Sequence, residues 1–114
     1  MGRQTVVELE EFRRQAAHLL DDEERNALID YLAQRPGSGD VIRGSGGVRK
    51  LRWRHAGTGK SGGLRVITIC SGPWLPLFLI TVYGKGARAS LTKAELNAMR
   101  RLTARLKEIY GGGR

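Results

Sequence analysis

The chain has 114 residues, of which 40% are hydrophobic and 27% charged, and a formal net charge of +9. This length supports one compact domain with a single core and excludes a large multi-part enzyme. The longest apolar run, Trp74 to Val82, is interrupted by Pro76 and Thr81 and is far shorter than the roughly 20 residues of a membrane-spanning helix. The N-terminal segment MGRQTVVELEEF has no apolar signal-peptide region, so we expect a cytoplasmic protein.

The charge is divided unevenly along the chain. Residues 1–47 contain six Lys or Arg and nine Asp or Glu, whereas residues 48–114 contain fourteen and two, so the two parts carry −3 and +12. Such segregation in one small domain predicts a basic face for a polyanion. Nucleic acid is the first candidate, an acidic membrane surface or protein partner comes second, and an ordinary solvated surface is the remaining interpretation.

The first third of the sequence predicts a short strand and a helical hairpin. Thr5 to Val7 is β-branched, as strands often are. Apolar residues then recur at helical spacing over about 9–35. Asp21 is placed as the N-cap of the second helix with Glu24 at its N3 position, and Pro36-Gly37 ends that helix. The segment 37–47, with five glycines, is expected to be a loop.

A basic sheet is predicted over about 48–83, with strands at 48–54, 64–70 and 77–83. In the first strand Lys50, Arg52 and Arg54 share one face, because side chains alternate along a strand. Thr92 and Glu95 form a capping box that opens a C-terminal helix over about 92–109, with Ile109 as the last residue of its apolar stripe. The order β-α-α-β-β-β-α indicates an α+β fold in one domain, 1–114.

Gly59-Lys60-Ser61 suggests a phosphate-binding loop at first sight. Such a loop reads G-x-x-x-x-G-K-[ST] and runs into a helix N-terminus. Here Arg54 stands where the first glycine belongs, and a strand pattern follows Gly62-Gly63. The segment is therefore interpreted as a glycine-lined connection between two strands. Cys70, the only cysteine, excludes a cysteine-rich zinc site, and we expect neither metal nor cofactor.

The blocks GGVRKLRW, GKSGGLRV, FLITVYGKGARASLTKAE and TVVELEEF together resemble the RelE/ParE superfamily of toxins, within it the HigB-type branch of type II toxin–antitoxin modules. The resemblance implies a RelE-like fold, in which a small twisted antiparallel-rich sheet packs on an N-terminal helical hairpin. It also implies a ribosome-dependent, metal-independent endoribonuclease that cuts mRNA. Its expected partners are the ribosome, mRNA and a helix-turn-helix, HigA-like antitoxin, with no membrane partner.

Cations suit this chemistry because RNA cleavage by its own 2′-hydroxyl passes through a dianionic phosphorane. The resemblance assigns Lys50 to proton transfer or charge stabilisation and Arg65 to the scissile phosphate. Among the other cations, Arg88 is assigned to the leaving-group side. The remaining basic residues are expected to bind RNA. They are Arg52, Arg54, Lys60 and Lys85.

The sequence departs from the family in its aromatic residues. Many relatives have aromatics after the arginine-valine pair of the second strand, whereas this chain reads Arg65-Val66-Ile67-Thr68-Ile69, without a base-stacking platform. Leu91-Thr92 also stands where the best-known relatives carry a tyrosine. For Trp53 and Trp74 the preferred interpretation is a core anchor, and a base-stacking residue is the alternative. For His55 the preferred interpretation is a loop residue, and a proton shuttle is the alternative. Two other functions stay open: a ParE-like gyrase inhibitor and a noncatalytic RNA-binding module.

Overall fold

The computed structural model describes residues 4–54, 63–70, 76–84, 86 and 91–111. Its five-stranded sheet has the order β1-β5-β4-β3-β2, in which β1 is parallel to β5 and all other neighbours are antiparallel. The elements in chain order are β1 (Val6–Glu8), α1 (Glu10–Leu19), α2 (Asp22–Gln34), β2 (Asp40–Val41), β3 (Val48–Trp53), β4 (Leu64–Ile69), β5 (Leu77–Gly84), α3 (Lys93–Leu106) and a π-helical turn, η1 (Lys107–Gly111). This architecture confirms the predicted α+β, RelE-like arrangement. The prediction that 37–47 is entirely a loop is wrong, because Asp40 and Val41 pair with β3 and form the short strand β2.

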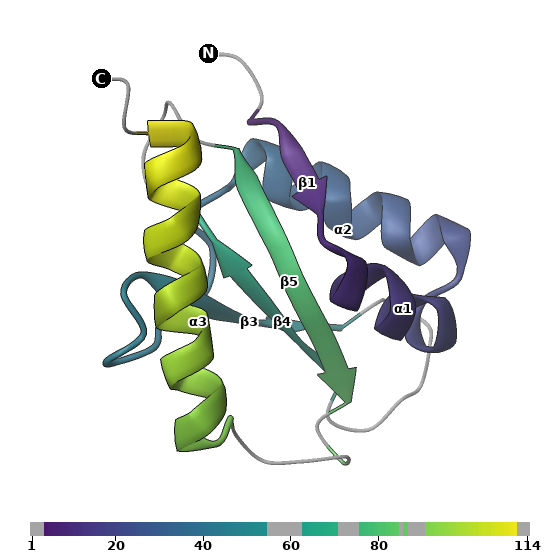
Figure 1. The fold of residues 1–114 in the computed structure, drawn as a ribbon. Coiled ribbons are helices and arrows are strands. Elements are labelled where there is room, and N and C mark those ends of the chain that lie inside the picture. Colours follow the sequence, from purple (N-terminus) through teal and green to yellow (C-terminus); the bar gives the residue numbers. More distant parts are fainter. Residues whose placement is uncertain (1–3, 55–62, 71–75, 85, 87–90, 112–114) are drawn as a thin grey trace.

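The helical hairpin of α1 and α2 covers one face of the sheet (Figure 1). Phe12 of α1 and Leu28 of α2 are fully buried there, together with Val66 of β4 and Val82 of β5. The turn into α2 is closed by a capping box, in which the Asp21 carboxylate accepts from the Glu24 amide at 2.7 Å and the Glu24 carboxylate accepts from the Asp21 amide at 3.0 Å. Sequence-local capping and one apolar stripe per helix thus fix this layer.

Helix α3 packs on the opposite face, so the sheet lies between two helical layers (Figure 1). Met99 and Leu106 of α3 contact a second apolar cluster that includes Ile67 of β4 and Phe78 of β5. The predicted capping box of Thr92 and Glu95 is present. The prediction that Ile109 continues the apolar stripe is wrong, because the chain changes to π-helical geometry at Lys107 and Ile109 is 60% exposed.

The glycine-rich connection between β2 and β3 is held by hydrogen bonds of Ser45 and Arg100. Ser45, fully buried, donates its hydroxyl to the carbonyl of Ile42 at 2.6 Å and accepts from the amide of Val48 at 3.0 Å. From α3, Arg100 donates to the carbonyl of Gly44 at 2.8 Å. This connection is therefore attached to the same face of the sheet as α3.

One β-bulge changes the direction of side chains along β5. Thr68 of β4 pairs with Leu79 and the preceding Ile67 pairs with Thr81, so Ile80 is an extra residue in β5. Alternation is reset at such a residue. As a result Leu79 packs on the hairpin side, and four residues later Tyr83 lies on the α3 side.

Candidate functional site

Strand register places two arginines and a tyrosine side by side across the sheet. Arg52 of β3 is opposite Arg65 of β4, and Arg65 is opposite Tyr83 of β5. Directly opposed residues in antiparallel strands have Cα atoms about 4.5–5.5 Å apart and side chains on the same face. In the neighbouring row, Lys50 of β3 is opposite Ile67 of β4. Lys50, Arg52, Arg65 and Tyr83 therefore share the α3 face of the sheet, and we call them the sheet site.

The members of the sheet site differ in their access to solvent. Arg52 is exposed and Lys50 is half-buried, whereas Arg65 is 8% exposed and Tyr83 is 6% exposed. The guanidinium of Arg65 donates to the carbonyl of its neighbour Leu64 over a long 3.5 Å. A charge that is partly removed from water interacts more strongly with a nearby anion than an exposed one does. Arg65 is thus the strongest candidate for the tightest phosphate contact.

Two like charges directly opposed across strands destabilise a sheet by themselves. Arg52 and Arg65 form such a pair across β3 and β4, and the third residue of that row is Tyr83. The described acid closest in register is Asp40 of β2, an exposed residue opposite Lys50. Two guanidinium groups in one row can both donate to the oxygens of a single phosphodiester, so this row is suited to such a ligand.

The other predicted RNA-binding residues are less fully placed. Arg54 is exposed and directly follows β3, at the same end of that strand as Arg52. Lys60, Lys85 and Arg88 lie outside the described residues, as do His55 and Trp74. The structure thus brings together Lys50, Arg52 and Arg65, with Arg54 next to them in sequence.

Arg49, the remaining cation of β3, has a structural role. It is opposite Val41 of β2 and donates to the carbonyl of Gly39 at 3.1 Å. Arg49 is next to Lys50 in the strand, so its side chain points to the other face. It therefore holds the edge of the sheet and does not join the sheet site.

Trp53 lies on the hairpin face, where it packs partly buried against the core. Its ring centroid is 5.4 Å from that of Tyr31, and the guanidinium of Arg35 lies 5.1 Å from the Tyr31 ring centroid. The face that carries Arg52 and Arg65 is the opposite one. This placement confirms Trp53 as a core anchor and leaves the base-stacking interpretation without support.

A strand, not a helix, follows the segment that contains Gly59-Lys60-Ser61, as the sequence pattern predicts. The triplet itself lies outside the described residues, but the chain enters β4 at Leu64 and no helix begins there. Gly63 has φ of +65° and an added Cβ would lie 2.8 Å from the carbonyl oxygen of Trp53. The glycine thus permits β3 and β4 to approach closely just before Arg65.

Tyr83 is the functional candidate that sequence reasoning missed. Counting alternation from Leu77 through an unbroken β5 puts Tyr83 on the hairpin face, away from Arg65. The extra residue Ile80 reverses that assignment. The sequence signal that could have indicated a bulge is the length of the apolar segment that forms β5. Only the pairing of β5 with β4 shows at which residue the bulge lies.

Comparison with known proteins defines the fold as RelE-like. An arginine-to-alanine double mutant of the E. coli toxin RelE, solved in the free state, is similar to this chain with a TM-score of 0.56 and 16% sequence identity. The similarity covers 88% of this chain and 96% of that one. No protein-family model matches the sequence.

Two further observations concern the described residues as a set. No helix among them is long and apolar enough to cross a membrane. Within the same residues, no three His, Cys, Asp or Glu side chains are grouped so that they could hold a metal ion.

Proposed function

We propose that this protein is the toxin of a type II toxin–antitoxin module, of the HigB-type branch, and that it cleaves mRNA on the ribosome. The observation that carries the proposal is the cross-strand row of Arg52, Arg65 and Tyr83, with Lys50 in the adjoining row, on a RelE-like fold. The +12 charge of residues 48–114 supports a nucleic-acid substrate.

The proposed reaction is an internal transesterification. The 2′-oxygen of one nucleotide loses its proton and attacks the adjacent phosphorus, and the bond from phosphorus to the 5′-oxygen breaks. The products are a 2′,3′-cyclic phosphate and a 5′-hydroxyl, the latter formed when the leaving oxygen takes up a proton. In this scheme Arg65 stabilises the doubly charged phosphorane, as a preorganised cation does for developing charge.

The other cations have supporting roles in the proposal. Lys50 transfers a proton or stabilises charge, and its ammonium next to the 2′-hydroxyl lowers the pKa of that hydroxyl. Arg88 acts on the leaving-group side. The residues proposed to hold the flanking RNA are Arg52, Arg54, Lys60 and Lys85. No step of this scheme requires a metal ion or cofactor.

The proposed partners follow from the same activity. A cytoplasmic toxin that cuts mRNA on the ribosome needs inhibition in its own cell, and we assign this to a helix-turn-helix antitoxin of the HigA kind. The basic surface attracts an acidic partner as well as RNA. Contact with the antitoxin therefore has two possible forms, coverage of the sheet site or steric exclusion from the ribosome.

A noncatalytic RNA-binding module is the second candidate, and one observation favours it. Among described strand residues on the sheet-site side of β3 and β4 there is no aromatic side chain, and β4 continues as buried aliphatic residues. Stacking on aromatics is the usual means by which proteins fix unpaired bases. Binding without cleavage would follow if the RNA were held only through its phosphates.

The test is primer extension on mRNA incubated with purified protein, with and without ribosomes. We expect codon-phased cuts that require ribosomes and that become about 10²- to 10³-fold slower in Arg65→Ala and in Lys50→Ala, the loss typical of one charge-stabilising group. Arg13→Ala, an exposed change on α1, is the matched control and should cut normally.

Three results would contradict the proposal in different ways. Equal slowing in Arg13→Ala would point to overall charge and not to the sheet site. An absence of cuts together with salt-sensitive RNA binding would identify the noncatalytic module. An absence of both would direct attention to inhibition of DNA gyrase, the activity of the ParE side of the superfamily.

A further inference from the structure

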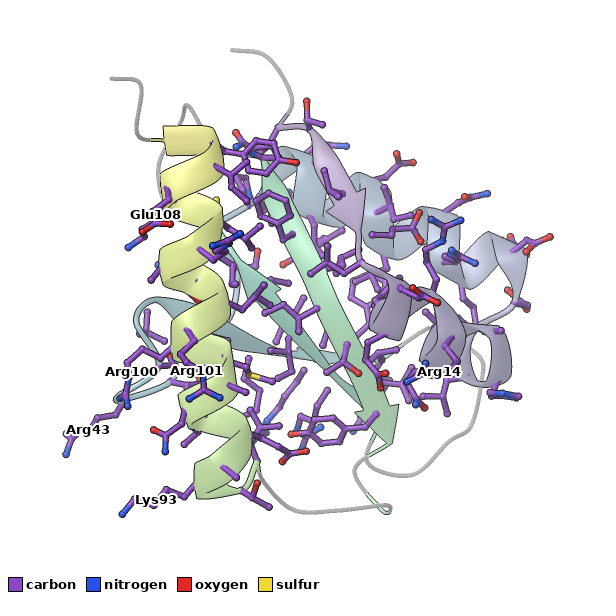
Figure 2. All side chains as sticks on the ribbon, in the orientation of Figure 1. Arg14, Arg43, Lys93, Arg100, Arg101 and Glu108 are labelled. Atoms are coloured by element: carbon purple, nitrogen blue, oxygen red, sulfur yellow. The ribbon has the colours of Figure 1, made fainter. Side chains whose placement is uncertain are left out.

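A second basic surface lies on the solvent side of α3, separate from the sheet site. Figure 2 shows Lys93, Arg100 and Arg101 projecting from the helix and Arg43 projecting from the β2–β3 connection beside it. All the cations of this surface are exposed. We call it the α3 ridge and define it as Arg43, Lys93, Arg100, Arg101, Arg105 and Lys107.

The ridge is built on a rigid support. Lys93 and Arg100 are seven residues apart, which is two helical turns or about 10.5 Å along the axis, and Arg101 and Arg105 are neighbours one turn apart. Arg43 is tied to the same helix because Arg100 donates to the carbonyl of Gly44, the residue after it, at 2.8 Å. The charges therefore form an ordered array along one side of the molecule.

This array carries an electrostatic penalty within the free protein. Arg101 and Arg105 are like charges at i and i+4, and Lys93 lies in the first turn, where the helix dipole disfavours a cation. In the described part of the chain none of the six ridge cations forms an ion pair. Of the two acids on α3 and η1, Glu95 is engaged in the capping box, and Glu108 is exposed beside Lys107 at the C-terminal end of the ridge. A bound polyanion would remove the penalty.

The composition of the ridge favours phosphates over a protein surface. Between its cations the outward positions of α3 are small: Ala94, Ala98 and Ala104 are all exposed. Protein interfaces usually contain large apolar or aromatic anchors at their centre; this surface has none between Lys93 and Arg105, and the exposed Ile109 and Tyr110 lie past its C-terminal end. Small residues between long cations instead allow a phosphate backbone to lie close to the helix.

The charge on the far side of the protein supports the same orientation. Helices α1 and α2 begin with acidic first turns and lie across the sheet from α3. A polyanion therefore attracts the α3 side and repels the hairpin side. The sheet site also lies on the α3 side of the sheet.

From these observations we propose that the α3 ridge binds the phosphate backbone of RNA, on the same side of the protein as the single strand held at the sheet site. The ridge supplies affinity and orientation, and it takes no part in bond breakage. The choice of RNA over other polyanions rests on the proposed function. The affinity of the ridge for RNA, however, is measured in an assay in which no cleavage takes place.

The experiment uses fluorescence anisotropy with a labelled RNA hairpin, over a range of salt concentrations and in the absence of ribosomes. The variant Arg101→Gln/Arg105→Gln removes two exposed ridge charges for which no hydrogen bond is described. The matched control, Arg13→Gln/Arg14→Gln, removes two exposed charges from α1 and lowers the net charge equally. Glutamine has nearly the helix propensity of arginine, so both variants should fold.

We expect the ridge variant to bind the hairpin about tenfold more weakly at low salt, with the slope of log K against log salt smaller in magnitude by about 1.4–1.8, as for two lost phosphate contacts. The control should retain the wild-type affinity and slope. Equal losses in both variants, or a loss in neither, would overturn the proposal. Tighter binding of the wild type to a DNA duplex of the same length would overturn the assignment to RNA.

A protein partner is distinguished in the same set of variants. If the ridge variant bound the hairpin normally but no longer bound its antitoxin, the ridge would be a protein interface and the proposal would be wrong. A wild type that binds the hairpin through the ridge but cuts no mRNA on ribosomes would leave this inference intact and remove the proposed nuclease. Failure of one proposal is therefore separable from failure of the other.

Discussion

Three glycine-to-alanine substitutions separate backbone strain from steric contact around the sheet site. Gly37 has no positive φ and an added Cβ meets nothing within 4 Å; Gly44 has φ of +78° and equally open space; Gly63 has φ of +65° and a Cβ contact of 2.8 Å with the carbonyl oxygen of Trp53. An alanine at Gly37 therefore causes neither strain nor a clash, at Gly44 it causes backbone strain alone, and at Gly63 it causes backbone strain together with a steric clash.

The expected magnitudes follow from these geometries. Gly37→Ala should be neutral or stabilise by up to about 1 kcal/mol, because alanine restricts the unfolded chain. Gly44→Ala should destabilise by about 1–2 kcal/mol through its left-handed backbone. Gly63→Ala adds to that strain a backbone contact that only separation of β3 and β4 relieves, for which overpacking suggests about 1–3 kcal/mol more. The total for Gly63→Ala is about 2–5 kcal/mol.

Urea unfolding followed by far-UV circular dichroism measures these differences as shifts of the midpoint at constant slope. The same preparations should be assayed for cleavage under conditions where each variant is folded. Gly63→Ala should then be impaired, because the pairing of Trp53 with Leu64 directly precedes Arg65 in β4. If Gly63→Ala were no less stable than Gly44→Ala, the argument from close approach would be refuted.

Three further outcomes are expected. Tyr83→Phe keeps the buried ring and removes the buried hydroxyl of the residue opposite Arg65, so ribosome-dependent cleavage should fall about 10²-fold through looser positioning of Arg65, while the unfolding free energy changes by only about 1 kcal/mol; normal cleavage would show that Tyr83 does not position Arg65. Thr92→Ala should destabilise by about 1 kcal/mol in urea unfolding through loss of the α3 cap, and Thr92→Ser should restore most of it. Ile109→Ala should change stability by less than about 0.5 kcal/mol, whereas Leu28→Ala, in the core, should cost about 2–5 kcal/mol; similar effects would show that Ile109 is packed in solution.

The helices could be predicted from the sequence because their signals are local. The capping boxes at Asp21 and Thr92 join residues three positions apart, and the apolar stripes of α1 and α2 follow helical spacing. The strand faces of β3 were also predictable, since alternation alone places Lys50 and Arg52 together. Local rules failed at the end of α3, where the π-helical turn exposes Ile109.

The candidate site was only partly predictable. Its residue types followed from the clustered positive charge and from the resemblance to RelE-like toxins, which named Lys50 and Arg65. Which cations meet, however, depends on the pairing of strands that are separate in sequence. Arg49 shows this limit, because it is as basic as its neighbours but faces the other side and holds Gly39.

By itself the sequence determined the helices, the single α+β domain, the segregation of charge and the composition of the basic sheet, because each depends on neighbouring residues or on totals. The tertiary structure alone decided that Arg52, Arg65 and Tyr83 form one row and that Arg43 joins the α3 ridge. Both results depend on contacts between distant parts of the chain. The bulge at Ile80 is the clearest case, since one extra residue in β5, detectable only by its pairing with β4, moves Tyr83 to the face that carries the arginines.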